Sequence, residues 1–246
     1  MYAKFFKRVI DFLLSLLALM LLSPILLILI IVGAIAMGGN PFFTQLRPGK
    51  INKKTGKEKI FKLIKFRTMS NKKDKDGNLL PDDERLNKYG RFLRSTSLDE
   101  LPELLNILVG QMSIVGPRPL LVEYLPYYTD EEAHRHDVRP GLTGWAQVNG
   151  RNVTVWDERL QQDLYYVKNC SFSLDMKILF MTVIKVVKKS DIVVGAQHGE
   201  GHGKLDKVRN YIPQRSYFMD GTPVGAESVS SENREVLNDK TTYSRQ

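Results

Sequence analysis

Apolar residues dominate the first forty positions of the chain and then give way to a mixed pattern. The stretch from Phe12 to Met37 carries no charged residue over 26 positions. About 20 apolar residues suffice to cross the hydrocarbon core of a bilayer, whereas the apolar part of a secretory signal has roughly 7 to 15 and precedes a small-residue cleavage site. The pattern therefore predicts a helix that enters a membrane.

Ser23 and Pro24 divide this apolar stretch near its middle. Proline removes a backbone donor and kinks a helix, and a serine hydroxyl can satisfy the carbonyl that is freed. The limb over residues 12–22 covers about 16 Å and the limb over residues 25–37 about 20 Å, so neither crosses the ~30 Å of hydrocarbon alone. A re-entrant hairpin over residues 1–40, which enters and leaves through one leaflet, fits these lengths.

Basic residues flank the apolar stretch on both sides. Lys4, Lys7 and Arg8 precede it, and twelve lysines and arginines lie between Arg47 and Lys75. The positive-inside rule places both flanks in the cytoplasm, which a single straight span cannot satisfy. The charges thus favour the hairpin over its alternative, an ordinary span with a proline kink.

From residue 41 the pattern is that of a soluble domain, which we place at residues 41–192. The segment KEKIFKLIKFRTM follows a turn at Thr55 and Gly56 and predicts a short strand in a basic hairpin. A polar loop, NKKDKDGNLLPDDERLNK, separates it from apolar helical runs further along the chain. Strands and helices together predict a small, mixed α/β domain.

The segment LDMKILFMTVIKVVKK, near the end of this domain, has helical periodicity. Asp175, Thr182, Lys185 and Lys189 form one narrow polar stripe opposite a broad apolar face. Such a helix can lie in the headgroup region of a membrane, with core packing as the alternative. The whole pattern predicts a mixed α/β fold with an N-terminal re-entrant membrane helix, a small cytosolic domain and interfacial amphipathic helices.

Residues 193–246 contain scattered charges and glycines and lack a sustained apolar period. This composition predicts a loosely ordered extension. It could close over an active site as a flap or bind a partner, and the sequence leaves this choice open.

The chain has a formal net charge of +9 and a single cysteine, Cys170. The charge favours a polyanionic partner, which could be a nucleic acid, an anionic membrane or a phosphorylated substrate. Dense lysines beside a membrane segment favour anionic headgroups, and no nucleic-acid-binding motif accompanies them, so we expect no nucleic acid partner. The lone cysteine excludes an internal disulfide, suits a reducing compartment and is expected in the core.

The stretch STSLDELPELL, residues 95–105, places two adjacent carboxylates, Asp99 and Glu100, before an apolar helical run. Ser97 and Glu100 have the spacing of a helix capping box, and the helix dipole favours an acid at position 99. Pro102 argues against a regular capped helix. It would fall at the fifth helical position, where it removes a hydrogen bond and clashes with the preceding turn.

A catalytic interpretation accounts for the proline. A distorted first turn would let the two carboxylates face one metal ion, which the ~100° between neighbours on an ideal helix hinders. Arg91 and Arg94 lie one turn earlier on a common face, and Arg118 lies between two prolines in GPRP. Carboxylates for Mg²⁺ beside arginines for phosphate are typical of phosphoryl transfer. Taken alone, these residues support capping and catalysis equally.

Four segments together resemble the bacterial sugar transferases, a family of monotopic polyprenyl-phosphate phosphoglycosyl transferases. They are KFFKRVIDFLLSLLALMLLSPILLI, KLIKFRTM, RSTSLDELPELLNILVGQMSIVGPRPLLVEYLP and RHDVRPGLTGWAQVNGRN, and they occur in the family's order between Lys4 and Ser190. The chain is most similar to the small members that transfer N,N'-diacetylbacillosamine phosphate. Because those members end near the position of Val193, the resemblance stops there.

The resemblance implies a two-step reaction at the cytoplasmic face of the bacterial inner membrane. An aspartate attacks the sugar-bearing phosphate of a UDP-sugar, UMP leaves, and the phosphosugar then passes from the enzyme to a polyprenyl phosphate. By position, Asp99 would be the nucleophile, and Glu100 would help to hold Mg²⁺ and the acceptor phosphate. The basic residues that would hold phosphates are Lys65, Arg94 and Arg118, with Arg91 as a further candidate. The break at Ser23 and Pro24 matches that of the family's re-entrant helix.

The segment VRPGLTGWAQVNGRN, residues 138–152, is rich in turn-forming residues. The resemblance favours a nucleotide-binding loop here, with Arg139 and Gln147 as candidates for substrate contact. The alternative is a buried turn around a packed Trp145.

Two other classes of protein compete with the enzyme. One is a non-catalytic adaptor that uses residues 47–75 to gather anionic lipids, and the other is a membrane-tethered nucleic-acid binder. Magnesium-dependent release of UMP from a UDP-sugar would separate the enzyme from both. The sequence leaves open which sugar is transferred, how long the polyprenyl chain is and which residues contact uridine. It also leaves open the oligomeric state, and a homo-oligomer is one possibility.

Overall fold

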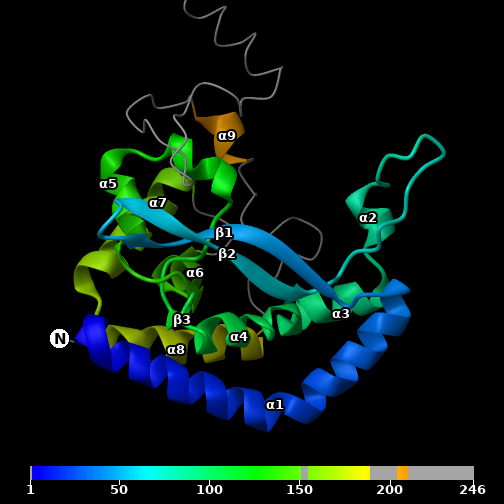
Figure 1. Cartoon of the computed structure of the whole chain (residues 1–246), viewed down its shortest axis with the longest axis horizontal. Helices are drawn as coiled ribbons and strands as arrows, with labels where there is room; N and C mark the ends of the chain where they lie inside the picture. The colour runs from blue at the N-terminus through cyan, green and yellow to red at the C-terminus, as the bar shows by residue number, and fades with distance from the viewer. Residues whose placement is uncertain (1, 151–154, 189–203, 210–246) are drawn as a thin grey trace, which may run out of the picture.

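A long antiparallel hairpin lies above a base of helices in the computed structural model, which describes residues 2–150, 155–188 and 204–209 (Figure 1). The strands are β1 (Phe42–Asn52), β2 (Lys57–Phe66), β3 (Ser113–Val115) and β4 (Gly141–Thr143). The helices are α1 (Lys7–Met37), α2 (Asp82–Arg85), α3 (Lys88–Thr96), α4 (Glu103–Leu108), α5 (Asp130–Ala133), α6 (Trp145–Gly150), α7 (Trp156–Asn169), α8 (Phe172–Lys188) and α9 (Leu205–Val208). Short 3₁₀ or π turns are η1 (Tyr2–Phe6), η2 (Leu98–Glu100), η3 (Val122–Tyr127) and η4 (His134–Asp137). The predicted mixed α/β fold is confirmed.

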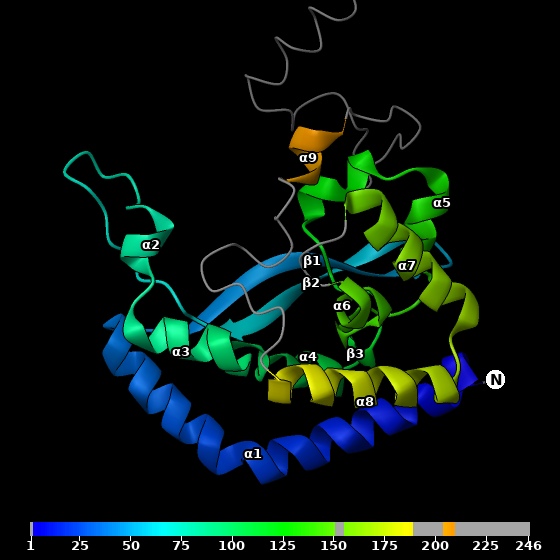
Figure 2. The same ribbon diagram turned by 180° about the vertical axis from the view of Figure 1, so that it is seen from behind.

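Helix α1 bends sharply in its middle (Figures 1 and 2). Pro24 lies inside it and lacks the N–H that would bond the carbonyl of Met20 four residues earlier. The Ser23 hydroxyl donates to that same Met20 carbonyl at 2.8 Å. The serine therefore satisfies the group that the proline frees, as the sequence predicted.

The N-terminal end of α1 is bound to the domain by buried polar groups. The Lys7 ammonium lies 2.6 Å from an oxygen of Asp175 in α8. The Asp11 carboxylate accepts from the Ser113 hydroxyl at 2.6 Å and from the Ile114 N–H at 3.0 Å, both on β3. These contacts fix the first limb of α1 against α8 and the β3–β4 pair.

The C-terminal end of α1 is bound to the same domain. The Tyr89 hydroxyl donates to the Leu29 carbonyl at 2.8 Å, and the Asn87 side chain donates to the Ala36 carbonyl at 3.1 Å. Both ends of α1 thus attach to one body, so the helix cannot cross a bilayer with its ends on opposite sides. The structure supports the re-entrant helix over the kinked span.

Lys7 and Arg8, which the sequence predicts as part of a cationic flank, bind the domain instead. Lys7 is buried in its pair with Asp175. Arg8 is half-buried and donates to the Ile107 and Leu108 carbonyls at the end of α4, each at 2.7 Å. These two charges hold α1 onto the domain.

The β1–β2 hairpin turns at Thr55 and Gly56 as predicted, with Gly56 at φ 68°. Phe61 and Leu63 of β2 pack with Leu104 and Ile107 of α4 in a buried cluster. The Asn106 side chain of α4 also accepts from the Ile64 N–H at 3.1 Å and donates to the Lys62 carbonyl at 2.8 Å. The backbone N–H and C=O groups along the edge of a sheet are otherwise unpaired. The Asn106 side chain pairs two of these groups on β2.

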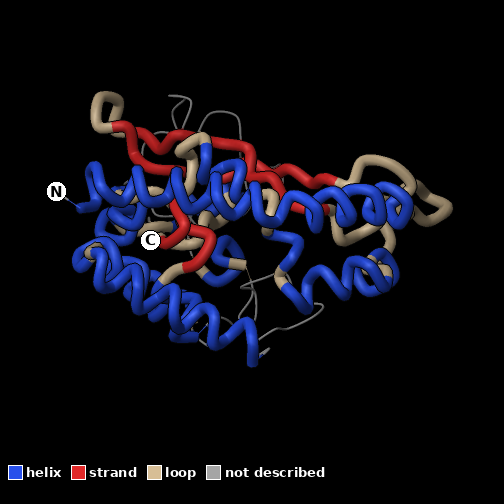
Figure 3. Tube along the Cα trace, turned by 90° about the horizontal axis from the view of Figure 1, so that it is seen from below, coloured by secondary structure: helices blue, strands red, loops and turns tan. Residues whose placement is uncertain are grey.

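Helix α8 presents its apolar face outwards. Phe180 and Val183 are 68% and 61% exposed, whereas Asp175 is buried and Thr182 lies 2.7 Å from the Thr143 hydroxyl of β4. The predicted polar stripe is therefore the face that packs on the domain, and Lys189 lies outside the described residues. Helix α8 runs beside the first limb of α1, and helices dominate this face (Figures 2 and 3). An apolar face turned outwards supports the interfacial helix over core packing.

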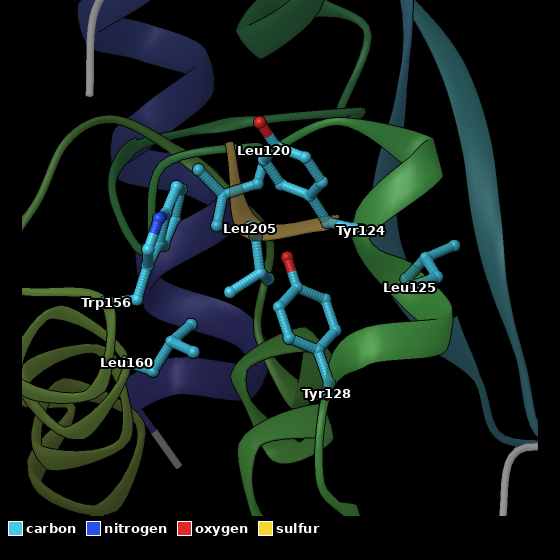
Figure 4. Close-up of a cluster of buried hydrophobic side chains, with 7 residues drawn as sticks. All are labelled: Leu120, Tyr124, Leu125, Tyr128, Trp156, Leu160 and Leu205. Carbon is cyan, nitrogen blue, oxygen red and sulfur yellow. The ribbon is translucent and has the colours of Figure 1, made fainter. Parts of the chain in front are cut away.

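Part of the C-terminal extension is folded onto the domain. Leu205 of α9 is fully buried in a cluster with Tyr124, Tyr128 and Trp156 (Figure 4). Arg209 pairs with Glu132 at 2.7 Å and also with Asp157. The predicted loosely ordered extension contains one short helix, which packs on the domain through buried Leu205 although its sequence has no apolar periodicity.

We expect Asp175→Ala to destabilise the fold strongly, because it leaves the Lys7 ammonium buried without its counter-ion. Removing one partner of a buried ion pair typically costs about 3–5 kcal/mol. Glu131→Ala is the control, since its pair with Lys168 is exposed on both sides and should cost less than ~1 kcal/mol. Unfolding of both variants in detergent measures the difference, and equal losses would contradict the anchoring role.

Cysteines at the two ends of the fold should react from the same side of the membrane. In a Cys170→Ser background, Phe5→Cys reports the N-terminal end, where residue 5 is 64% exposed. Lys54→Cys reports the tip of the β1–β2 hairpin. A membrane-impermeant maleimide should label both or neither in intact cells, and both after lysis. Labelling of only one in intact cells would show that α1 crosses the bilayer.

Candidate functional site

A cavity of about 430 Å³ opens between the β1–β2 hairpin, α3 and the segment around Arg118. Its charged lining residues include Arg47, Lys65, Arg94, Asp99, Glu103 and Arg118. Leu120, Tyr124 and Trp156, from the cluster that contains Leu205, form an apolar wall. Cations therefore outnumber carboxylates in this set, and the cavity suits an anionic ligand with an apolar or aromatic part.

A backbone reversal at Ser97 precedes Asp99, which lines this cavity. Ser97 ends α3 with φ 56°, and it is the one residue other than glycine with a positive φ in the described parts of the chain. Its side chain makes no capping hydrogen bond, so the capping-box interpretation is wrong. The chain instead continues as the 3₁₀ turn η2, and Pro102 stands immediately before α4. A proline at a helix start is tolerated because no helical N–H is required there.

This reversal gathers three carboxylates within five residues. Asp99, Glu100 and Glu103 are 6%, 5% and 2% exposed. Glu103 was not singled out from the sequence, although it follows Asp99 by four residues and directly succeeds Pro102. Its role could have been suspected from that spacing alone, which places two acids on one side of a helical turn.

Two cations neutralise the carboxylates. The Lys65 ammonium lies 2.9 Å from Glu100 and 3.1 Å from Glu103. The Arg118 guanidinium donates to the same Glu100 oxygen at 2.7 Å. Lys65 comes from β2, and Arg118 follows β3, so Glu100 joins three segments that are distant in sequence. Burial of such charges is tolerated only when they are paired in this way.

One carboxylate oxygen of Asp99, Oδ1, is buried and has no hydrogen-bond partner among the described residues, and the same holds for Glu103 Oε1. Glu103 Oε1 nevertheless lies 3.1 Å from the Lys65 ammonium, which leaves Asp99 Oδ1 as the oxygen without a nearby counter-ion. Burial, reinforced by the charge of Glu100, raises the pKa of Asp99 to about 6, against the opposing pull of nearby cations. Burial likewise raises the pKa of Glu103 to about 7. Asp99 is thus mostly ionised at pH 7 and is the carboxylate with an oxygen available for a ligand.

Further cations surround Asp99. The Arg94 guanidinium donates to the Thr68 hydroxyl at 3.1 Å and to the Met69 sulfur at 2.9 Å, which aims it along the cavity wall. Arg47 donates to the Pro119 carbonyl at 3.2 Å, and burial lowers its pKa to about 10, so it stays charged at pH 7. Arg47 was counted in the basic segment but was not predicted as a site residue.

Three predicted site residues lie elsewhere. Arg91 is exposed and donates to the Leu86 carbonyl at 3.3 Å. Arg139 lines a second cavity with Lys50 and donates to the Gly110 carbonyl at 2.8 Å. Gln147 lines a third cavity. Of the residues predicted to hold phosphates, the structure brings Lys65, Arg94 and Arg118 together around the cavity that Asp99 lines, and Arg91 does not line it.

The segment at residues 138–150 consists mostly of β4 and α6 and packs on the domain. Its strand β4 pairs in parallel with β3, and a Cβ atom at Gly144 would lie 2.2 Å from the Gly116 carbonyl oxygen, so only glycine fits there. Trp145 packs against Tyr165 with ring centroids 5.4 Å apart. The alternative of a buried turn is therefore supported, and Arg139 and Trp145 do not line the central cavity.

The site offers a divalent cation few protein ligands. Among the described residues, no three histidine, cysteine or acidic side chains gather in a way that could enclose a metal ion. Asp99 Oδ1 is available, whereas the Glu100 oxygen is already shared by Lys65 and Arg118. Magnesium is usually held by one or two carboxylates together with substrate phosphates and water. The residues fit an ion of that kind, bound with a phosphorylated ligand.

Comparison with known proteins is consistent with this chemistry. Residues 2–189 match the family model described as bacterial sugar transferase. The uncharacterized sugar transferase EpsL of Bacillus subtilis (strain 168) is 50% identical over 186 residues, which cover 76% of this chain and 89% of that protein.

Two longer relatives carry more specific names. The UDP-glucose:undecaprenyl-phosphate glucose-1-phosphate transferase of Klebsiella pneumoniae is 41% identical over 73% of this chain and 40% of that protein. The undecaprenyl-phosphate galactose phosphotransferase of Salmonella typhimurium (strain LT2) is 36% identical over 77% of this chain and 42% of that protein. The chain thus spans well under half the length of these two relatives.

Proposed function

Because the chain belongs to the bacterial sugar transferase family, we propose that it moves a sugar 1-phosphate from a UDP-sugar to a polyprenyl phosphate. The observation that carries this proposal is the buried, unpartnered oxygen of Asp99 among Lys65, Arg94 and Arg118. Relatives named for UDP-glucose, galactose and undecaprenyl phosphate support the donor and acceptor classes. We name UDP-sugars only as a class, because the names of the relatives and the resemblance to diacetylbacillosamine transferases point to different sugars.

The reaction has two displacements at one phosphorus atom. A carboxylate oxygen of Asp99 attacks the sugar-bearing phosphorus of the donor, the bond from that phosphorus to the bridging oxygen breaks, and UMP leaves with the electron pair. An oxygen of the polyprenyl phosphate then attacks the same phosphorus, and the Asp99 carboxylate leaves. The product is a polyprenyl diphosphate sugar, and Asp99 is restored.

The cationic residues make the first displacement feasible. A carboxylate is a weak nucleophile, and a diphosphate repels it, so attack requires that negative charge be neutralised around the phosphorus. Arg94 and Arg47 line the cavity without a carboxylate partner in the described parts of the chain and are placed to bind donor phosphates. Lys65 and Arg118 are held by Glu100 and Glu103, which fixes their positions before the substrate arrives.

Magnesium is part of this proposal. Asp99 would hold the ion together with donor phosphate oxygens, and the bound ion would neutralise charge on the departing UMP. Glu100 was predicted as a second ligand. Its pairing with Lys65 and Arg118 instead supports a role in positioning those cations.

The membrane-facing elements support reaction at an interface. The bent helix α1 and the outward apolar face of α8 lie on one side of the domain (Figure 2), and a polyprenyl phosphate carries its phosphate at headgroup depth. Nucleotide sugars arrive from the aqueous side. We place the enzyme at the cytoplasmic face of the bacterial inner membrane.

We expect Asp99→Asn to lower UMP release from the preferred UDP-sugar by roughly 1,000-fold or more, because it removes the nucleophile. Purified protein is screened against UDP-glucose, UDP-galactose and UDP-N,N'-diacetylbacillosamine, with polyprenyl phosphate in detergent micelles. Asp83→Asn is the matched control, since residue 83 is exposed on α2 and does not line the cavity. Unchanged turnover of Asp99→Asn would refute the nucleophile.

Donor alone should leave the sugar phosphate on the wild-type chain. Intact-protein mass spectrometry after acid quench should show an added sugar phosphate, mapped by proteolysis to Asp99. If the protein were instead a lipid-gathering adaptor, the wild type and Asp99→Asn would bind anionic vesicles equally well, and neither would release UMP. Product formation without any adduct would exclude the two-step mechanism.

Chelation tests the metal. EDTA should reduce UMP release to background, and added Mg²⁺ should restore it, because the donor phosphates need charge neutralisation that the protein alone supplies only in part. Membrane binding measured in the same samples should not change. Full turnover in EDTA would remove magnesium from the mechanism.

A further inference from the structure

A short helix that lies beyond the family match packs behind the cavity that Asp99 lines, which we call the donor cavity. The match ends at residue 189, and α9 begins at Leu205. We propose that α9 and Arg209 hold the aromatic wall of the donor cavity in place and thereby set the affinity for the donor. The inference rests on the proposed function and adds to it a determinant of donor binding outside the family match.

The apolar wall of the donor cavity consists of Leu120, Tyr124 and Trp156. Tyr124 belongs to η3, and Trp156 is the first residue of α7. The two rings meet edge to face, with centroids 5.5 Å apart and planes at 79°. Such a pair fixes the rings relative to each other. The position of the wall in the cavity therefore depends on what packs behind it.

Leu205 packs behind the two rings. It is fully buried in one cluster with Tyr124, Tyr128 and Trp156, and Figure 4 shows it between the tryptophan and the two tyrosines. Leu205 itself does not line the cavity, so it acts on a ligand only through the wall. Because protein interiors are close-packed, removal of this side chain leaves a void into which the rings can move.

Arg209 fixes the same wall through its charge. Its guanidinium donates to both oxygens of Glu132, at 2.7 and 2.9 Å, and to the Tyr127 carbonyl at 3.4 Å. It also pairs with Asp157, the residue that follows Trp156. A bidentate pair between arginine and a carboxylate fixes orientation as well as distance. Arg209 therefore joins η3 and α7, the two elements that carry the aromatic wall, to α5.

The donor cavity has two parts that match the two parts of a UDP-sugar. Lys65, Arg94 and Arg118 suit the diphosphate, whereas the aromatic wall suits an uncharged ring, either uracil or sugar. A displaced wall weakens the packing of that ring and leaves the cations and Asp99 where they are. Loss of α9 contacts should therefore weaken donor binding without slowing the chemical step.

Leu205→Ala tests the wall, and Val208→Ala is its matched control, because Val208 is an apolar residue of the same helix and is 56% exposed. We expect Leu205→Ala to raise the KM for the UDP-sugar roughly tenfold with kcat unchanged, and Val208→Ala to stay within about twofold of wild type. Leu205→Met, which conserves volume, should keep the wild-type KM. An unchanged KM in Leu205→Ala would overturn the inference.

Inhibitors distinguish the wall from the phosphate-binding part. UDP carries the uracil, whereas pyrophosphate carries only the charges. In Leu205→Ala the inhibition constant of pyrophosphate should not change. A raised inhibition constant for UDP would identify uracil as the ring on the wall, and a raised KM for the UDP-sugar alone would identify the sugar. An equal rise for pyrophosphate would show that the whole cavity is altered and would overturn the inference.

Arg209→Gln provides a second comparison that creates no void in the cluster. Exposed Lys207→Gln is its control, since it removes the same charge from α9. Arg209→Gln should raise the KM for the UDP-sugar about threefold, and Lys207→Gln should not. The same KM in both variants would show that Arg209 has no part in donor binding.

Fluorescence tests the position of the wall without turnover. The chain has two tryptophans, so a Trp145→Phe background leaves Trp156 alone. Leu205→Ala should shift its emission to longer wavelength because water reaches the ring, whereas Val208→Ala should not. Unchanged emission would overturn the role of Leu205. If the wild type releases no UMP from any donor, the proposed function fails, and the emission shift still decides whether α9 holds the wall.

Discussion

The shared oxygen of Glu100 is the contact on which the site depends. Lys65 reaches it from the β1–β2 hairpin and Arg118 reaches it from the segment after β3. Three buried carboxylates within five residues would repel one another and lose hydration, so η2 can form only where these cations are brought to it. The hairpin, held by Asn106 and the apolar cluster around Ile107, is thus required by the charges as much as by the core.

The same arrangement leaves Asp99 in a state suited to chemistry. The cations that stabilise Glu100 also offset the cost of an ionised Asp99, while burial keeps water and competing donors from its free oxygen. A carboxylate that made its usual hydrogen bonds would be less reactive. The positive φ of Ser97 maintains this geometry, since such backbone strain persists only where the surrounding structure fixes it.

The sequence was informative where local chemistry decided the structure. The break at Ser23 and Pro24 and the turn at Thr55 and Gly56 follow from neighbouring residues. The residues around Asp99 supported capping and catalysis equally, and the family resemblance favoured catalysis. Long-range contacts decided the rest. Nothing local distinguishes Arg91 from Arg94, because Arg94 is positioned by Thr68 and Met69, which lie about 25 residues earlier in the chain, whereas Arg91 bonds the Leu86 carbonyl. The polar stripe of α8 was identified correctly, but its direction depends on Lys7, a partner 168 residues away. Leu205 lies in a polar segment and gave no signal.

The bend of α1 has a consequence for the lipids around it. With both of its ends held by one domain, a re-entrant α1 would take up lateral area in a single leaflet and leave the opposite monolayer undisturbed. Because Ser23 satisfies the Met20 carbonyl within the helix itself, the bent helix α1 keeps its shape without contacts from other membrane helices. The protein should therefore respond to the packing density and spontaneous curvature of the monolayer it occupies, and be indifferent to total bilayer thickness.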